Sequence, residues 1–349
     1  MIDGEILIWG EFLPNTHSGI SVSNQTLLYF LHSENIFPIK IEEYSWNKKN
    51  FTKLLHYLQI YFKLYKTIYR KNIRIFYFSL PLSVLGGIKF LIVLPIIKIL
   101  SKKTIIKAHI HRGDFKVFTN KNNLNRLITR CGFWFIDEII VLSPLFQQDI
   151  INFSKKMKVR VLHNTSSVES SQKKMARTYK REFICISNYI KSKGIQELVE
   201  CFGFDALKNC NLTIYGQPYD EKFLNRLKLS ATQNVSLKGL LGRNDIFGKL
   251  NKFDCLIMPS WNEGQPIVII EAMSMAVPVI ATNVGDIPSL LGENYRFLAQ
   301  SGNPESLFQT ILAYDKYEKK SEISTSLYHR YLNNYSNEKY KIKLLDIFN

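Results

Sequence analysis

The chain has 349 residues, 46% of them hydrophobic and 21% charged, a composition that excludes an intrinsically disordered chain and, at this length, suits two domains of roughly 150 residues each. Its 46 Lys and Arg outnumber 29 Asp and Glu, so the formal net charge is +17 at pH 7. The five cysteines are scattered and form no C-x-x-C pair, which excludes a disulfide framework and a zinc site and favours a reducing compartment. No basic leader precedes the first apolar run, so we expect a cytoplasmic protein.

Short apolar runs alternate with helix-length segments through the first 163 residues. Strands are predicted at 5–12, 36–41, 73–78, 104–110, 138–142 and 159–162, and helices at 20–33, 50–71, 83–101, 121–135 and 145–153. The most apolar window, 80–100, contains two lysines and two prolines, so it predicts a buried or membrane-apposed helix and not a membrane span.

Basic residues dominate part of this first half. No carboxylate occurs from 44 to 113, while Lys and Arg occur fourteen times between Lys48 and Arg112, interleaved with Tyr and Phe. This pattern favours an anionic partner, namely a membrane surface, a pyrophosphate or a nucleic acid. The alternative is a set of solvated helix faces in a lysine-rich protein. No helix-turn-helix, zinc-finger or RNP-type signature accompanies the charge, so no nucleic-acid partner is expected.

The alternation restarts after a polar stretch at 164–181, which we interpret as an interdomain linker. Strands are predicted at 182–186, 211–215, 235–237, 254–258 and 277–281, with helices between them, and a last helical segment at 331–349 is expected to pack back on the first domain. The predicted fold class is α/β, with Rossmann-like, doubly wound domains at 1–163 and 164–330 that face each other across a cleft. Ligands in such sheets bind at the carboxyl ends of the strands.

One segment carries most of the chemistry. After the strand at 254–258, the loop holds Glu263 and Gly264, and Pro266 is predicted at the first position of a helix. Glu271 is the only charge between Gly264 and Gly285, on a helix that is apolar around its circumference. A buried carboxylate there must be paired, hydrogen-bonded or ligand-facing. It is suited to bind ribose hydroxyls, and the alternative is a bond to a backbone amide in a domain interface.

Residues 263–273 read Glu-Gly-Gln-Pro-Ile-Val-Ile-Ile-Glu-Ala-Met, with two glutamates eight positions apart, and residues 278–285 read Pro-Val-Ile-Ala-Thr-Asn-Val-Gly. Both resemble the donor site of retaining glycosyltransferase family four, the glycogen-synthase-like and mannosyltransferase-like enzymes of the GT-B fold. The resemblance is strongest over 180–300. It implies that Glu271 binds the ribose, that Glu263 binds the donor sugar, and that the backbone of Gly264, Gln265 and Pro266 contacts the sugar and phosphate.

Two further segments of the second half resemble the same family. Residues 185–195, Cys-Ile-Ser-Asn-Tyr-Ile-Lys-Ser-Lys-Gly-Ile, are similar to its phosphate loop, in which Lys193 would hold the departing pyrophosphate. Asn188 stands where the family usually has arginine, a departure for which Lys191 is a candidate compensation. The turn Lys-Gly-Leu-Leu at 238–241 resembles the turn whose backbone reads the nucleotide base, which implicates Gly239 and Leu240.

The match in the first half is looser. Gly19 stands where the family's glycine loop leads into a helix. Residues 107–115, Lys-Ala-His-Ile-His-Arg-Gly-Asp-Phe, resemble its histidine tip, so His111 would contact the donor sugar, with His109 on the same strand face. Arg112 and Asp114 follow at the expected rim of the cleft.

The resemblance implies retaining transfer of a sugar from a nucleoside-diphosphate sugar to an acceptor hydroxyl, with Glu263, His111 and Lys193 as catalytic residues. It also implies that the enzyme uses no metal and no cofactor beyond the nucleotide-sugar co-substrate. The basic first half favours a lipid-linked or oligosaccharide acceptor in bacterial surface polysaccharide assembly, at the inner face of the cytoplasmic membrane. The alternatives are a catalytically silent partner subunit and a nucleotide-sugar epimerase or phosphorylase of the same fold. Nucleotide base, donor sugar, acceptor and linkage stay open.

Overall fold

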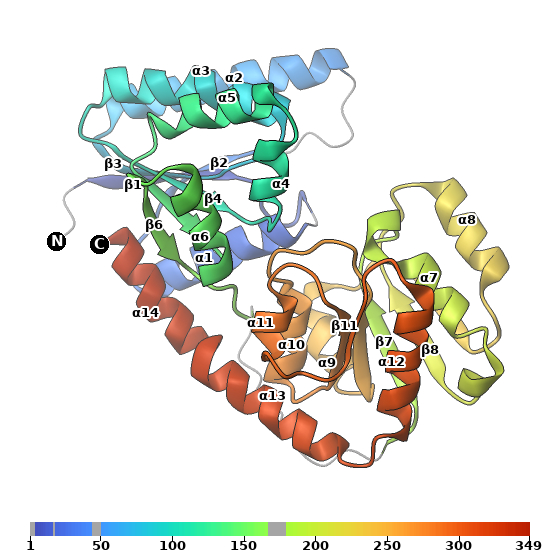
Figure 1. The fold of residues 1–349 in the computed structure, drawn as a ribbon. Helices are drawn as coiled ribbons and strands as arrows, with labels where there is room; N and C mark the ends of the chain where they lie inside the picture. Colours follow the sequence, from blue (N-terminus) through green and yellow to red (C-terminus); the bar gives the residue numbers. More distant parts are fainter. Residues whose placement is uncertain (1–3, 17, 44–49, 167–178) are drawn as a thin grey trace. The chain divides into compact units, whose positions relative to one another are not determined.

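A computed structural model describes residues 4–16, 18–43, 50–166 and 179–349, which form two compact units (Figure 1). The first unit comprises Met1–His163 and Tyr340–Asn349, and the second comprises Asn164–Lys339. Among the described residues, no helix is both long enough and apolar enough to span a bilayer.

The first unit is built on a six-stranded parallel sheet. Its strands are β1 (Glu5–Gly10), β2 (Ile39–Glu42), β3 (Ile73–Ser79), β4 (Ile105–Ile110), β5 (Glu138–Val141) and β6 (Lys158–Val161), in the order β2-β1-β3-β4-β5-β6. The central strands are buried along nearly their whole length, because helices cover both faces of a parallel sheet.

Different helices cover the two faces of this sheet (Figure 1). One face packs against α1 (Gly19–Ser33) and α14 (Asn337–Phe348). The other packs against α2 (Asn50–Arg70), α3 (Val84–Leu100), α5 (Asn123–Phe133) and α6 (Pro144–Phe153), and α4 (Phe115–Asn120) contributes Phe115 to the same core. Arg74 and Lys107 donate hydrogen bonds to the last carbonyls of α14 and so hold the chain's C-terminal helix on the sheet.

The second unit repeats this architecture. Its parallel strands are β7 (Glu182–Ile186), β8 (Asn211–Tyr215), β9 (Val235–Lys238), β10 (Cys255–Met258), β11 (Val279–Thr282) and β12 (Leu298–Ala299), in the order β12-β11-β10-β7-β8-β9. One face packs against α7 (Ile195–Cys201), α8 (Glu221–Ser230) and α12 (Pro304–Lys316). The other packs against α9 (Ile246–Leu250), α10 (Ile267–Ser274), α11 (Ile287–Leu291) and α13 (Lys320–Asn334).

All eleven predicted strands form, and the predicted α/β class with two doubly wound sheets is confirmed. The two-residue strand β12 has no sequence prediction, because a run this short shows no periodicity. The segment predicted as a helix at 121–135 begins later, as α5, and the short α4 precedes it. The facing of the two domains across a cleft stays a prediction.

Two segments differ from their predictions. The helix predicted at 331–349 is divided, since α13 ends at Asn334 and α14 begins at Asn337. The predicted linker begins as a packed segment, because Asn164 and Thr165 are buried and bonded to the second unit, Thr165 through the Tyr335 carbonyl at 2.7 Å. Linker residues 167–178 lie outside the described residues.

Candidate functional site

The strand order of the second sheet defines where a ligand should bind. From β7 the chain moves outward through β8 and β9 on one side, and then returns to build β10, β11 and β12 on the other. The order therefore reverses between the neighbouring strands β7 and β10, and the loops that follow both strands leave the same edge of the sheet. Such a reversal point is the usual ligand crevice of a doubly wound sheet.

Lys193 and Glu263 meet at this reversal point. Lys193 closes the 3-10 turn η1 (Lys191–Lys193) after β7, and Glu263 lies in the loop after β10. Lys193 Nζ donates to Glu263 Oε1 at 2.6 Å, with the side chains 29% and 12% exposed. Two residues from different loops, each a candidate from the sequence, thus form one partly buried ion pair.

Close backbone packing holds these two loops together. Gly194 has φ +65°, and a Cβ there would lie 2.0 Å from the Pro259 carbonyl oxygen, so only glycine fits. The backbone N–H of Trp261 donates to the Ser192 carbonyl at 2.8 Å. The loop carrying Lys193 and the loop carrying Glu263 are therefore one packed structure.

The loop after β11 supports Glu263 from the other side. Gly285 has φ +55°, and a Cβ there would lie 1.9 Å from the Glu263 carbonyl oxygen. The side chain of Gln265 donates to Asp286 Oδ2 at 2.6 Å and accepts the Asn164 N–H at 2.6 Å. Since Gln265 is only 4% exposed, its side chain braces the loop, and any contact with a donor is left to its backbone.

Glu271 lies one helical turn inside α10. The helix begins at Ile267, and Pro266 is its N-cap. Pro266 was predicted at the first helical position, but its backbone is extended, so it precedes the helix by one residue. Glu271 is 0% exposed and forms an ion pair with Arg243, while its Oε2 atom has no hydrogen-bond partner. Burial raises the pKa of Glu271, and the neighbouring Arg243 guanidinium opposes that rise.

Arg243 is the functional candidate that the sequence reasoning missed. It lies in the 3-10 turn η3 (Arg243–Asp245), which follows the turn after β9, and its side chain is 24% exposed. The sequence offered one signal for such a residue: a carboxylate on an apolar helix must have a partner, but the sequence does not say which residue that partner is. Glu271 accordingly uses a charged side chain as its partner, and the predicted alternative of a backbone amide is wrong.

The remaining candidates of the second unit are arranged differently. Asn188 Oδ1 accepts the Gln217 N–H at 3.2 Å, so this side chain ties the loop after β7 to the loop after β8. Lys191 Nζ lies 5.7 Å from the centre of the Trp261 ring. A Cβ at Gly239 would meet no atom within 4 Å, so no packing in the chain explains this glycine. Leu240 is 48% exposed.

In the first unit, His111 follows β4 and is a half-buried member of a polar group whose inner members, His109 and Tyr77, are buried. Its Nε2 atom lies 3.3 Å from Ser79 Oγ, and its ring centre lies 3.9 Å from that of His109. His109 Nδ1 lies 2.5 Å from the Tyr77 hydroxyl. Burial lowers the pKa of His111 to about 3 and holds that of His109 well below its usual value, so both rings are neutral at pH 7.

The other candidates of this unit lie at the ends of β1 and β4. Gly19 begins α1, whose N-cap Ser18 also donates to Glu11 Oε2 at 2.9 Å. A Cβ at Gly19 would meet nothing within 4 Å, as at Gly239. Arg112 and Asp114 pair with each other, with Arg112 Nε 2.9 Å from Asp114 Oδ1, so they are not bound to either histidine.

The candidates therefore fall into two groups. Lys193, Glu263, Gly264 and Pro266 surround one reversal point, with the Glu271–Arg243 pair in the same unit. His111 and Gly19 belong to the first unit. Among the described residues, no three His, Cys, Asp or Glu side chains converge to hold a metal ion, and metal independence stays a prediction.

Comparisons with known proteins agree with the geometry of the second unit. Residues 180–314 match the family model described as Glycosyl transferases group 1. TuaC of Bacillus subtilis, whose name assigns it to teichuronic acid biosynthesis, is 24% identical over 226 residues, 64% of this chain and 56% of TuaC. CapM of Staphylococcus aureus, a capsular polysaccharide biosynthesis glycosyltransferase, is 26% identical over 204 residues, 53% of this chain and 54% of CapM. The match thus spans about half the length of these curated relatives.

Solved structures share the fold along the whole chain. Sucrose-phosphate synthase from Thermosynechococcus elongatus has a TM-score of 0.75 and 13% identity, covering 99% of this chain and 98% of that one. Anabaena HepE, solved in complex with UDP and glucose, has a TM-score of 0.72 and 13% identity, covering 99% of each chain. These similarities show the two-domain α/β fold of GT-B glycosyltransferases, as the sequence predicted.

Proposed function

We propose that this chain is a retaining glycosyltransferase that moves a sugar from a nucleoside-diphosphate sugar to an acceptor hydroxyl. The observation that carries the proposal is the Lys193–Glu263 ion pair, 2.6 Å long, at the reversal point of the second sheet. Segment 180–314, which contains this pair, is the part that matches the group 1 glycosyl transferase model.

The proposed chemistry uses the charges of this site. The bond between the sugar C1 and the diphosphate oxygen breaks, and the acceptor oxygen bonds to C1 from the same face of the sugar. Negative charge grows on the leaving diphosphate, which also takes the acceptor's proton. Lys193 is placed to stabilise that charge, and Glu263 to bind the sugar hydroxyls. No metal is assigned a role.

Glu271 and Arg243 complete the proposed donor site. An Oε2 atom without a hydrogen-bond partner on a wholly buried carboxylate is suited to accept a bond from a ribose hydroxyl. The Arg243 guanidinium opposes the effect of burial on the Glu271 pKa and so favours the ionised carboxylate. His111, neutral at pH 7, is suited to a hydrogen bond with an uncharged sugar and not to an ion pair.

The acceptor in this proposal is a lipid-linked saccharide of bacterial surface polysaccharide assembly. Relatives named for teichuronic acid and capsular polysaccharide synthesis support that assignment. So does a galactosyltransferase of Escherichia coli, named for a diphosphoundecaprenol-linked acceptor, which is 27% identical over 134 residues, 37% of this chain and 35% of that protein.

The test is donor binding followed by transfer. UDP-, GDP-, ADP- and CMP-sugars are screened by thermal shift, and the tightest donor is measured by calorimetry against wild type and Glu271→Gln. The variant should lose about 1.5–3 kcal/mol of donor binding free energy, the range for a hydrogen bond to a charged group. Unchanged affinity in a variant with a native circular dichroism spectrum removes Glu271 from the donor site.

A turnover assay separates the proposal from a catalytically silent partner subunit. A transferase releases nucleoside diphosphate from its donor, by hydrolysis or by transfer, and a silent subunit binds the donor without releasing it. The anomeric configuration of the product, read by NMR, then decides between retention and inversion. Activity that a chelator abolishes would contradict the metal-independent mechanism.

A further inference from the structure

Helix α3 is apolar on both of its sides. Its inner side is buried in the core of the first unit through Phe90, Val93, Leu94 and Ile97. Its outer side is a stripe at helical spacing that is exposed to solvent: Leu85 82%, Ile88 42%, Ile92 52%, Ile96 40% and Ile99 74%. A helix that is apolar all round is normally enclosed, so this stripe lacks the cover that its composition demands.

The two charges of α3 are removed from this stripe by ion pairs. Lys89 Nζ lies 2.6 Å from a Glu43 carboxylate oxygen, and its side chain is only 12% exposed. Lys98 Nζ lies 2.6 Å from Asp137 Oδ2. The outer stripe therefore presents aliphatic side chains alone.

Neighbouring helices extend the apolar surface on both sides of α3, which contacts α2 and α5 (Figure 1). Helix α2 adds an exposed stripe at the same spacing: Leu55, Leu58, Phe62, Tyr65 and Tyr69. The α5 region adds Leu124, Leu127 and Trp134, the last 83% exposed. Together these exposed residues of α2, α3 and α5 form what we call the apolar face.

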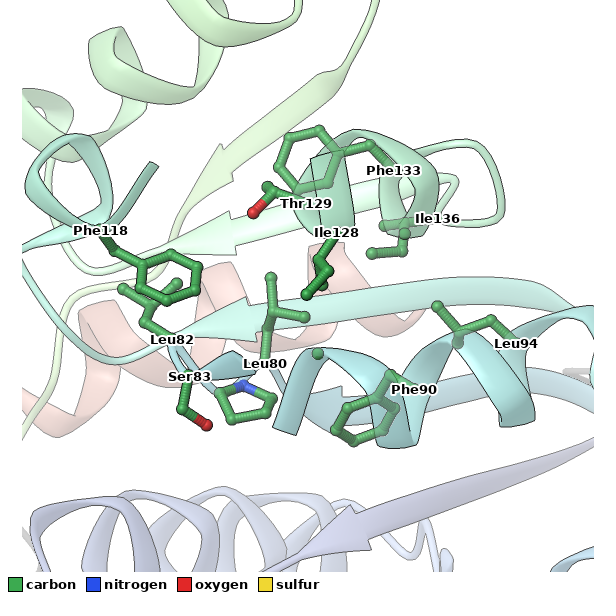
Figure 2. A pocket seen from close by; sticks show the side chains of 13 residues that line it. Leu80, Leu82, Ser83, Phe90, Leu94, Phe118, Ile128, Thr129, Phe133 and Ile136 are labelled. Carbon is green, nitrogen blue, oxygen red and sulfur yellow. The ribbon is translucent and has the colours of Figure 1, made fainter. Parts of the chain in front are cut away.

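Figure 2 shows that apolar lining continues between α3 and α5. Phe90 and Leu94 of α3 and Ile128 and Phe133 of α5 line a small pocket with a volume of about 30 Å³. The two helices approach closely beside it, since a Cβ at Gly87 would lie 2.4 Å from Ile128. Buried apolar packing therefore joins the inner side of α3 to α5, and these are the two helices whose outer residues belong to the apolar face.

Cations outnumber anions along the segment that carries the apolar face, and the flanking carboxylates Glu43 and Asp137 are paired with Lys89 and Lys98. Residues 44–136 contain eighteen Lys and Arg and a single carboxylate, Asp114, which is paired with Arg112. The exposed cations include Lys63, Lys66 and Arg70 on α2, Lys102 and Lys103 just after α3, and Arg126 and Arg130 on α5. This combination of an uncharged aliphatic centre and a basic rim matches an anionic interface with an apolar interior.

We propose that the apolar face docks on an anionic lipid bilayer, with α3 in the plane of the interface and its outer stripe among the upper acyl chains. A second copy of this chain is a poorer occupant, because a twofold contact would bring the same basic rim against itself. The docking surface belongs to the first unit. It depends on the proposed function in one respect, namely that a lipid-linked acceptor would be found at the membrane.

The test is flotation of the full chain with phosphatidylcholine vesicles, with and without phosphatidylglycerol and without any nucleotide sugar. Salt is varied from about 0.1 M to about 1 M, where the Debye length falls from about 10 Å to about 3 Å. Binding to the anionic vesicles should weaken with salt but persist at high salt, because insertion of the aliphatic stripe is not screened.

Two triple variants separate insertion from charge. Ile88→Gln/Ile92→Gln/Ile96→Gln should weaken vesicle binding at least about tenfold at every salt concentration. Lys63→Glu/Lys66→Glu/Arg70→Glu should weaken it by a similar factor at low salt only.

Matched controls carry the same changes elsewhere. Leu229→Gln/Leu332→Gln/Ile342→Gln alters residues that are 88%, 39% and 59% exposed, outside the apolar face. Lys208→Glu/Lys222→Glu/Lys228→Glu makes the same charge change on exposed positions of the second unit. Both controls should float like wild type, and all variants should keep the wild-type Tm and donor affinity. Donor binding is measured separately, so a failed flotation leaves the proposed transfer reaction intact.

Three results would overturn the proposal. The first is wild type that ignores anionic vesicles at low salt. The second is an isoleucine variant that floats as well as wild type. The third is a stable dimer in solution that the isoleucine variant converts to monomers, because the apolar face would then be covered by a second copy.

Discussion

The ion pair between Arg243 and Glu271 predicts an asymmetric response to removal of its two partners. Glu271 is 0% exposed and Arg243 is 24% exposed. Arg243→Ala leaves the carboxylate of a wholly buried glutamate without its cation, whereas Glu271→Gln leaves a guanidinium that already reaches solvent. We therefore expect Arg243→Ala to lower the free energy of unfolding of the second unit much more than Glu271→Gln does.

The size of the loss follows from proton uptake. A buried carboxylate without its cation can take up a proton. The unfolded pKa of a glutamate is about 4.3, which is about 2.7 units below pH 7, and protonation at pH 7 costs about 1.4 kcal/mol of folding free energy for each of these units. The electrostatic loss in Arg243→Ala is therefore limited to about 4 kcal/mol. Glu271→Gln keeps the side-chain volume and a hydrogen-bond acceptor, so its expected loss is about 1 kcal/mol. The double variant should be more stable than Arg243→Ala alone, because the buried charge is gone.

The pH dependence has a definite sign. In Arg243→Ala the folded pKa of Glu271 lies above its unfolded value, so the folded state binds more protons and gains stability as the pH falls. Because burial already raises the pKa of Glu271 in wild type, the deficit should shrink by at most about 1.4 kcal/mol per pH unit as the pH falls from about 7. Loss of any other Arg243 contact would be independent of pH over this range.

Native-state hydrogen exchange of the β10 and α10 amides measures this free energy for the second unit without assuming that both units unfold together. The four proteins of the cycle are wild type, Arg243→Ala, Glu271→Gln and the double variant. Two results would contradict the buried ion pair as the cause. One is an Arg243→Ala variant whose free energy of unfolding at pH 7 falls no more than that of Glu271→Gln, and the other is a loss in Arg243→Ala that does not change with pH.

Three other predictions concern the proposed chemistry and two half-buried histidines of the first unit. Lys193→Ala should lower kcat by about 10- to 100-fold while donor affinity changes less, because the leaving diphosphate gains charge in the transition state; a rise in KM alone would make Lys193 a docking residue. His111→Ala should impair transfer and leave binding of the free nucleoside diphosphate nearly intact, as measured by calorimetry, and equal losses would place His111 elsewhere. Burial holds the folded pKa of His111 at about 3 and that of His163 at about 4, below the unfolded value of about 6.5, so the unfolded state binds more protons on acidification. Hydrogen exchange of β3 and β4 amides should therefore show the first unit losing up to about 1.4 kcal/mol per histidine per pH unit from about pH 6.5 downward, and a flat profile would contradict the lowered pKa values of these two histidines.

Much of the fold follows from the amino-acid sequence alone. Short apolar runs separated by helix-length segments predict parallel strands, since both faces of such a sheet are covered. All eleven runs are strands, and the loops that carry Lys193 and Glu263 directly follow β7 and β10. Local periodicity suffices here because it reflects which side of each element is buried.

Only the tertiary structure decided which side chains meet. The neighbouring of β7 and β10, about 70 residues apart in the chain, brings Lys193 to Glu263, and no local pattern contains that pairing. The same holds for Arg243 beside Glu271 and for Gln265 bound between Asn164 and Asp286. It also decided which stripe of α3 is buried, because a helix apolar on both sides has no sequence signal for its orientation. Partners distant in sequence depend on strand order and on the packing of whole elements, and composition and period do not encode either.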